Sequence, residues 1–222
     1  MKTLHIPLLL AILSISPLAL ASPLSQSETE ELVNRIEALH AAKPSLQANF
    51  REERHMAMLK SPVVNEGKVW CTLPDKIRRE IGGNTPSTTV IDGKKMVIYY
   101  PNFKEEELYD LERRPVLRDS LEALTAGLDF QKVYNFYNIQ ATREGSVYRI
   151  VLTPKTPTLR RVVKSVVLTV DPSLAPTRVD FESARGEKIS TTYSNVRREA
   201  IPESMFQFSA PAGTNVTNPL GS

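Results

Sequence analysis

The apolar positions near the start of the chain have the spacing of one helical face. Between residues 32 and 39 apolar side chains recur every three or four positions. Ser27, followed three residues later by Glu30, has the spacing of a capping box, and Pro44 ends the pattern. The sequence therefore predicts a helix that begins at Ser27 and ends near His40.

From Ser45 onward the spacing of apolar residues changes to strict alternation. Leu46, Ala48 and Phe50 alternate with polar residues, as in a strand with one buried face. Similar stretches recur, and most of the links between them are too short for a parallel crossover. We therefore predict one curved antiparallel sheet of roughly ten strands with helices on one face. The predicted strands cover residues 45–51, 67–73, 76–81, 88–100 (a hairpin), 108–111, 137–143, 147–153, 162–170, 177–183 and 188–196.

The hairpin at residues 88–101 is the most informative of these stretches. Two runs rich in β-branched and aromatic residues flank Asp92 and Gly93, a pair that favours a two-residue type I′ turn. The second arm, from Lys95 to Tyr100, carries apolar or aromatic side chains on both faces. Both faces therefore need cover, and two interpretations stay open: an ordinary protein core, or a concave apolar face that a ligand fills.

A second helical stretch interrupts the strands at residues 115–126. Leu117, Leu121 and Leu124 fall on one face of the predicted helix, and Gly127 is placed to cap its C-terminal end. This is the one convincing helix that the pattern predicts among the strands.

The first residues have the pattern of a cleaved export signal. Lys2 precedes the apolar run 6–20, which closes in Ala-Leu-Ala, so we expect cleavage after Ala21. The run is broken by proline and serine and is short for a membrane span. We predict a single domain over residues 22–213 and a loose C-terminal tail over residues 214–222.

Charge and cysteine content exclude several classes of protein. Without Lys2 the chain has 27 basic against 25 acidic residues, a balance too small for a nucleic-acid binder. Cys71 is the only cysteine, so there is no disulfide framework and no lipid-bearing cysteine at the predicted cleavage site. We interpret the acidic run at residues 105–107 as a solvated loop.

No motif of catalysis or metal binding stands out. The chain has no G-x-S-x-G elbow, no Gly-rich phosphate loop, and no H-E-x-x-H or C-x-x-C pair. His40 and His55, the two histidines outside the signal, have no partner at ligand spacing. We expect no enzyme activity, no metal and no cofactor, although the many carboxylates leave an envelope hydrolase open as a minor alternative.

Four pairs of arginines are spread along the chain, and we interpret most of them as solvated. Arg79 differs because alternation places it on the same side as Ile77 and Ile81. A cation on an apolar face either extends to the rim or meets an anionic or carbonyl group of a ligand. The pairs are Arg78-Arg79, Arg113-Arg114, Arg160-Arg161 and Arg197-Arg198.

Six groups of short segments are spread over nearly all of the predicted mature chain. They are Ala48-Asn49-Phe50, Gly67-x-x-Trp70-x-x-x-Pro74, Asp92-Gly93-Lys94 with Tyr99-x-Pro101, Tyr137-Asn138-Ile139, Leu152-Thr153-Pro154-Lys155, and Phe206-Gln207-Phe208 followed by Pro211-x-Gly213. Together, and in this order, they resemble the periplasmic outer-membrane lipoprotein carrier family, LolA.

The resemblance implies a strongly curved antiparallel sheet, an unclosed half-barrel, with helices forming a lid over an apolar cavity. It implies a monomeric periplasmic carrier that holds the acyl chains of lipoproteins, with an inner-membrane ABC release complex and an outer-membrane receptor as partners. The physics fits such a task, because baring three acyl chains of ~14 carbons to water would cost on the order of 30 kcal/mol. A sensor or regulatory module of the same fold, or a carrier of another envelope lipid, remains an alternative.

This chain departs from the family pattern at three positions. The family has an arginine before the proline that ends the tryptophan strand, where it helps to hold the lid closed, and this chain has Leu73 there. Aromatic residues expected further on are replaced by Ile77 and Arg79. Arg78 or Arg79 is therefore a candidate substitute for the latch, at the rim or lid.

We predict the acyl-chain cavity from the strand patterns, without knowing which face of each strand points inward. The expected lining residues are Phe50, Trp70, Ile77, Val90, Val97, Tyr99, Ile150, Leu152, Val179 and Phe181 from the strands, with Leu117, Leu121 and Leu124 from the lid helix.

Overall fold

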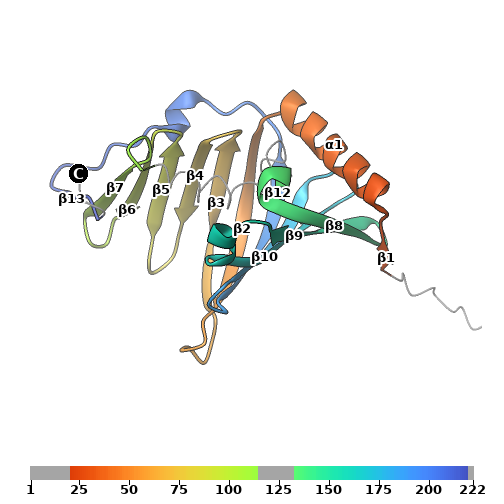
Figure 1. The fold of residues 1–222 in the computed structure, drawn as a ribbon. Helices are drawn as coiled ribbons and strands as arrows, with labels where there is room; N and C mark the ends of the chain where they lie inside the picture. Colours follow the sequence, from red (N-terminus) through yellow and green to blue (C-terminus); the bar gives the residue numbers. More distant parts are fainter. Residues whose placement is uncertain (1–20, 115–132, 220–222) are drawn as a thin grey trace, which may run out of the picture.

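The computed structural model of the protein describes residues 21–114 and 133–219. Most of these residues lie in strands, and the helices are few (Figure 1). The elements are β1 (Ser22–Pro23), α1 (Gln26–Ala42), β2 (Ser45–His55), β3 (Val63–Thr72), β4 (Lys76–Ile81), β5 (Ser87–Asp92), β6 (Lys95–Tyr100), β7 (Glu105–Asp110), α3 (Val133–Phe136), β8 (Tyr137–Glu144), β9 (Val147–Pro154), α4 (Pro157–Arg160), β10 (Val163–Val170), β11 (Pro176–Ser183), β12 (Lys188–Arg197), the short 3-10 helix η2 (Glu203–Phe206) and β13 (Asn215–Thr217).

The strands form one sheet in the order β1-β8-β9-β10-β11-β12-β2-β3-β4-β5-β6-β7-β13. Its two edge strands are β1 and β13, so the sheet does not close into a barrel, and Figure 1 shows that it is strongly curved. Neighbouring strands are antiparallel apart from the parallel pair of β7 and β13. The predicted curved, unclosed and mainly antiparallel sheet is confirmed.

The N-cap of helix α1 is Ser25, two residues before the cap that the sequence pattern predicted. The hydroxyl of Ser25 accepts a hydrogen bond from the backbone N–H of Glu28, and the Glu28 carboxylate accepts one from the backbone N–H of Ser25 at 2.8 Å. This capping box replaces the predicted one at Ser27, because the same spacing of serine and glutamate occurs twice in succession. The helix ends as expected, with Lys43 as its C-cap.

One half of the sheet is packed solidly against α1. Leu32, Val33 and Ile36 of the helix are at most 2% exposed and belong to the main core. Their partners lie chiefly on β8 to β10, where alternate residues supply aliphatic side chains to one face. The other buried residues of this core, from strands, loops and the short helices α3 and α4, are Val133, Tyr137, Ala141, Ile150, Leu152, Leu159, Val163, Val166, Leu168, Val170 and Leu174.

The turn between β5 and β6 differs from the predicted type. Asp92 Oδ1 accepts hydrogen bonds from the backbone N–H groups of Lys94 and Lys95, at 3.0 and 2.9 Å. Only Gly93 in this turn has a positive φ, of 87°. A type I′ turn needs positive φ at both central residues, so that prediction was wrong, although the hairpin itself is confirmed.

The acidic run and the C-terminal residues also differ from expectation. Residues 105–107 are not a loop but the first half of β7, each paired with β6 and, on the other side, with β13. The predicted loose tail over residues 214–222 contains β13, whose backbone pairs in parallel with β7. Hydrogen bonding to two neighbouring strands satisfies the backbone of this acidic segment, and this outweighs the low strand propensity of glutamate.

The C-terminal segment around η2 covers the sheet on the face opposite α1. Arg78 Nη1 donates a hydrogen bond to the Met205 carbonyl at 3.2 Å, and Tyr99 packs against Phe208 with ring centres 5.3 Å apart. Phe206 is 2% exposed. Helix η2 thus lies against β4 and β5. It covers the apolar face of the β5–β6 hairpin that points away from α1.

Three predictions fall on residues outside those described. They are the export signal with cleavage after Ala21, the helix at residues 115–126, and the last residues of the tail. Within the described part of the chain, α1 and the shorter helices lack the length and apolarity needed to cross a bilayer.

Candidate ligand-binding face

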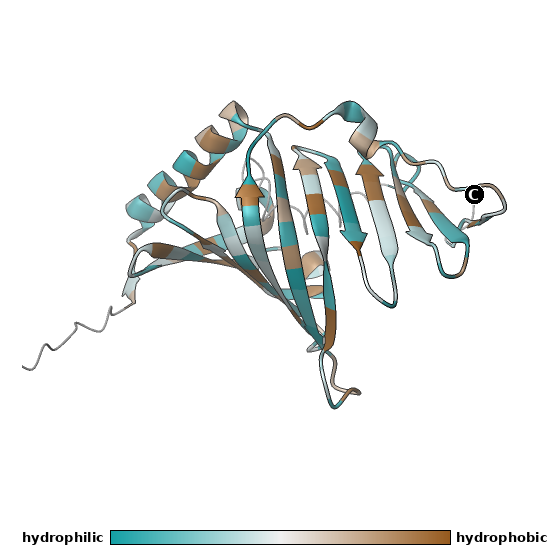
Figure 2. Cartoon of the chain, turned by 180° about the vertical axis from the view of Figure 1, so that it is seen from behind, coloured by the Kyte–Doolittle hydropathy of each residue, from teal (hydrophilic) through white to brown (hydrophobic). Residues whose placement is uncertain are grey.

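Cross-strand register divides the sheet into two faces. Directly paired residues lie on the same face, so a face can be followed from strand to strand. From Leu168 in the α1 core the pairs run through Val179 and Thr191 to Glu52 of β2. We call this side, which carries α1, the concave face and the other the outer face. In Figure 2, which views the sheet from behind, hydrophobic and hydrophilic bands alternate along the strands.

An apolar row crosses the concave face from β3 to β7. The register pairs Cys71 with Ile77, Ile77 with Ile91, Ile91 with Met96, and Met96 with Tyr109. Cys71 is buried, whereas the other four side chains are partly exposed. We call these five residues the apolar row. The concave face therefore has two parts: one filled by α1 and one in which apolar side chains keep contact with solvent.

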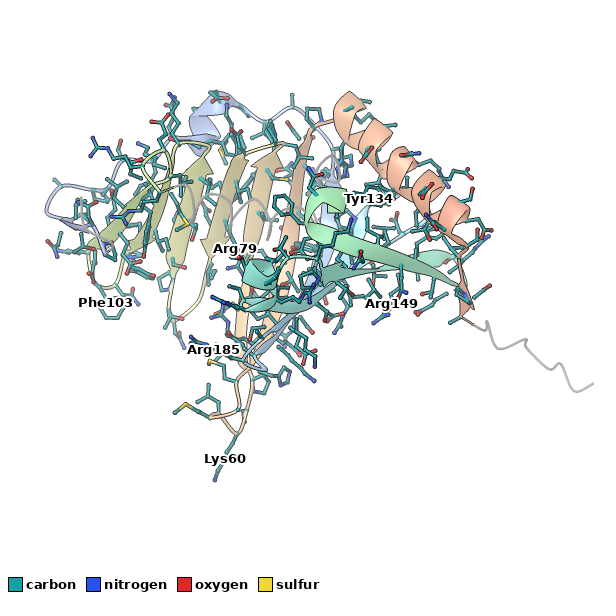
Figure 3. The ribbon with its side chains drawn as sticks, viewed as in Figure 1. Lys60, Arg79, Phe103, Tyr134, Arg149 and Arg185 are labelled. Carbon is teal, nitrogen blue, oxygen red and sulfur yellow. The ribbon has the colours of Figure 1, made fainter. Side chains whose placement is uncertain are left out.

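A charged pair lies on the same concave face, one step along the strands from the apolar row. Arg79 Nη2 is 2.6 Å from Glu52 Oε2, and the Arg79 guanidinium lies 4.2 Å from the centre of the Phe50 ring. Asn65 Nδ2 donates to Glu52 Oε1 at 3.4 Å, and Arg54 Nη2 is 3.7 Å from the same oxygen. Glu52 is only 6% exposed, so its carboxylate is buried among donors. Figure 3 labels Arg79 on the sheet.

Burial changes the acidity of two groups near this pair. Desolvation raises the pKa of the Tyr193 phenol to about 12, with the Arg79 charge acting in the opposite direction. Desolvation also raises the pKa of the Cys71 thiol to about 11. Both groups are therefore neutral at physiological pH, and they add to the apolar character of the concave face.

The residues predicted to line one cavity are divided between the two faces. Register places six of the ten described residues on the concave side: Phe50, Ile77, Ile150, Leu152, Val179 and Phe181. It places the other four on the outer side: Trp70, Val90, Val97 and Tyr99. Ile150 and Leu152 are fully buried in the α1 core. Leu117, Leu121 and Leu124 lie outside the described residues.

The four outer-face residues have structural partners of their own. Trp70 Nε1 donates to Gln47 Oε1 at 2.9 Å. Val90 and Val97 are 3% and 4% exposed on the face that η2 covers, and Tyr99 packs on Phe208. These residues could not be assigned a side from the sequence, because β5 and β6 carry apolar residues on both faces and alternation does not say which is concave.

The two candidate arginines also lie on opposite faces. Arg78 is paired with Trp70 and Val90 on the outer face and binds Glu80 at 2.7 Å. Arg79 lies on the concave face, where its alternation with Ile77 and Ile81 predicted it. Glu52 was not among the predicted site residues, although the alternation of Leu46, Ala48 and Phe50 already placed it on an apolar face.

Hollows in the described residues are of two kinds. A small apolar pocket of about 40 Å³ lies between the end of α1 and the concave face, lined by residues that include Ile36, Cys71 and Leu168. This volume has room for roughly three water molecules, at about 10–15 Å³ each, and an acyl chain needs much more. A broad, open hollow of about 1290 Å³ is lined mostly by polar and charged residues, among them Lys68 and Glu80 of the outer face. Neither hollow suits an acyl chain, because the first is too small and the second is lined mostly by polar groups.

The described residues contain no group of three or more His, Cys, Asp or Glu side chains that could hold a metal ion.

The curved, unclosed sheet and the apolar row on its concave face define a half-barrel protein whose concave side is apolar and partly exposed. The family model for the outer membrane lipoprotein carrier protein LolA matches residues 42–209, well over half of the chain. The protein therefore belongs to the LolA family.

Individual relatives are distant. An outer-membrane lipoprotein carrier protein of Pseudomonas fluorescens (strain Pf0-1) is 29% identical over 136 residues, which cover 60% of this chain and 63% of that protein. The carrier protein of Pseudomonas putida (strain KT2440) is 23% identical over 205 residues, 92% of this chain and 96% of that protein. Among solved structures, an uncharacterized conserved protein from Thermus thermophilus matches with a TM-score of 0.54 and 14% identity, covering 87% of this chain and 99% of that one. This last likeness concerns the fold alone.

Proposed function

We propose that this protein is a periplasmic carrier that binds the acyl chains of lipoproteins on its concave face and takes them from the inner to the outer membrane. The cargo comes from an inner-membrane ABC release complex and passes to an outer-membrane receptor. The export signal that the first 21 residues resemble delivers the chain to that compartment. No catalytic step is part of this function, since a carrier only binds and releases.

The apolar row is the observation that carries this proposal. It crosses strands β3 to β7, and four of its five side chains are partly exposed, although they lie on the side of the sheet that forms the core elsewhere. Each methylene that such a surface removes from water contributes about 0.8 kcal/mol, so several methylenes of one chain together bind usefully. Membership of the LolA family supports the same conclusion.

A closed cavity under a helical lid is also part of the proposal. The lid is assigned to residues 115–126, with Leu117, Leu121 and Leu124 toward the cargo, on the sequence pattern alone. A movable cover fits the task, because a carrier must shield hydrocarbon during transit and release it at the receptor. The small volume of the apolar pocket beside α1 supports an arrangement in which cargo occupies the β3–β7 half.

The direct test is to purify the protein from its host envelope, extract it with organic solvent and identify acylated material by mass spectrometry. Uptake of a fluorescent fatty-acyl probe by the purified protein gives a second readout. We expect acylated peptides in the extract and saturable probe binding. A clean extract together with no probe uptake would overturn the proposal.

A pair of matched variants locates the binding face. Ile91→Gln places an amide in the apolar row, and we expect probe affinity to fall roughly tenfold, because a polar group then meets the hydrocarbon. Val151→Gln makes a similar change at a partly exposed position on the outer face of β9, and we expect little effect on affinity. Equal losses in both variants would argue against the concave face as the site.

A further inference from the structure

The Glu52–Arg79 pair is an unusual feature of the concave face. Charged groups are costly to remove from water, and a buried ion pair seldom contributes net stability. Nevertheless, Arg79 lies two residues from Ile77 of the apolar row, on the same face of β4. An acyl chain along that row therefore has the guanidinium within reach of one end, since two residues of a strand span roughly 7 Å.

The guanidinium of Arg79 is only partly used by the protein. Its Nη2 contacts Glu52, and its plane lies over the Phe50 ring. Within residues 21–114 and 133–219, no acceptor is hydrogen-bonded to its Nε or Nη1. The Arg79 side chain is 28% exposed, whereas that of Glu52 is 8% exposed. Glu52 and Phe50 thus hold the guanidinium in place and leave N–H groups available to a ligand.

Resting on the carrier function proposed above, we propose that Arg79 binds an acceptor oxygen at the polar end of an acyl ligand. The oxygen is an ester carbonyl or a carboxylate, and the hydrocarbon lies along the apolar row. Glu52 positions the guanidinium and does not itself contact the ligand. The concave face then recognises acylated molecules rather than plain hydrocarbon.

Arg78 provides a control on the same strand. It is next to Arg79 in sequence but lies on the outer face, where it contacts Glu80 and the Met205 carbonyl. A general effect of lost positive charge on ligand attraction would occur in variants of either arginine. A specific contact with the ligand would be lost only in variants of Arg79.

The experiment measures displacement of a fluorescent fatty-acyl probe by dodecanoate, methyl dodecanoate and dodecane, with the full-length protein. These ligands share a chain and differ in carrying a carboxylate, an ester or no oxygen. The variants are Arg79→Met, Arg78→Met and the double variant Glu52→Gln/Arg79→Met. The double variant is included because Arg79→Met alone takes the closest cation from the buried Glu52 carboxylate, which destabilises the fold.

We expect the wild-type protein to prefer the oxygen-bearing ligands over dodecane. In the double variant, this preference falls roughly tenfold, as for the loss of one hydrogen bond to a charged donor, while dodecane affinity holds. Arg78→Met keeps the wild-type preference. A loss for the acid only or for the ester only identifies which oxygen Arg79 binds.

Unchanged preference in the double variant, or equal loss for all three ligands, would overturn the role of Arg79 while leaving acyl binding intact. Failure of the wild-type protein to bind any of the three ligands would instead overturn the carrier function, and with it this assignment.

Discussion

Gly67 is a position in β3 where the sheet leaves no space for a side chain. A Cβ added there would overlap the carbonyl oxygen of Glu80 and would lie 2.8 Å from Cζ of Phe50. The Phe50 ring lies beneath the guanidinium of Arg79. The missing side chain of one glycine therefore allows the ring to lie close to the sheet, and the ring in turn supports the cation on the concave face.

Replacing Gly67 by alanine should destabilise the protein. We expect the free energy of unfolding of Gly67→Ala to fall by roughly 2 to 3 kcal/mol, as for an overpacked core, because the overlapping carbonyl belongs to the backbone and moves little. Gly82→Ala is the control, since its nearest neighbour would be 3.9 Å away, and we expect a change within about 0.5 kcal/mol. Urea unfolding monitored by Trp70 fluorescence measures both. Identical midpoints for the two variants would contradict the expected clash.

At the scale of elements, the sequence predicted most of the strands but not the faces that they present. Alternation located β2, β4 and the hairpins because one face of each packs against protein. The same signal was ambiguous for β5 and β6, whose outer face is covered by η2, a segment more than a hundred residues further along the chain. Whether Val90 and Val97 lie on the concave or the outer face therefore could not be predicted, because it depends on a long-range contact that the local pattern does not encode.

This cover makes a prediction about Phe206. The Phe206 side chain is 2% exposed at the end of η2, so Phe206→Ala leaves a void over the outer face of β4 and β5. We expect a loss of about 3 to 5 kcal/mol in the free energy of unfolding, measured by chemical denaturation. Phe103→Ala makes the same substitution at a site that is 75% exposed, and little change is expected there. A small loss at Phe206, comparable to that at Phe103, would mean that the C-terminal segment does not stabilise the sheet.

At the scale of the whole molecule, one sheet serves two purposes. Its β8 to β11 half is covered by α1 and supplies the main core, while its β3 to β7 half keeps a concave apolar surface that is partly exposed. The curved sheet followed from the short turns and the alternation in the sequence. The difference between the halves did not, because it depends on where α1 packs. Alternation placed Glu52 on the apolar face of β2, but its partner Arg79, from another strand, is known only from the tertiary structure.

Cys71 lies where the half of the sheet that α1 covers meets the half that carries the apolar row, so its reactivity is a probe of this junction. It begins the apolar row and also lines the small pocket with Ile36 of α1. The residue is 7% exposed, and burial raises the pKa of its thiol to about 11. As the only cysteine in the chain, it gives an unambiguous signal with a thiol reagent. At pH 8 we expect labelling of the native protein to be on the order of 100-fold or more slower than that of the urea-unfolded chain, because the thiolate is the reactive form.

Two helix variants test whether α1 causes this protection. Ile36→Ala removes a side chain that is 1% exposed in the main core and lines the same small pocket as Cys71, so labelling should accelerate as the junction loosens. Asn34→Ala alters an exposed position of the same helix and should leave the rate unchanged. Rapid labelling of the native wild-type protein, or equal rates in the two variants, would show that α1 does not close the junction. The burial of Cys71 would then be due to its own small cluster with Leu46 and Ala48 and not to the packing of α1.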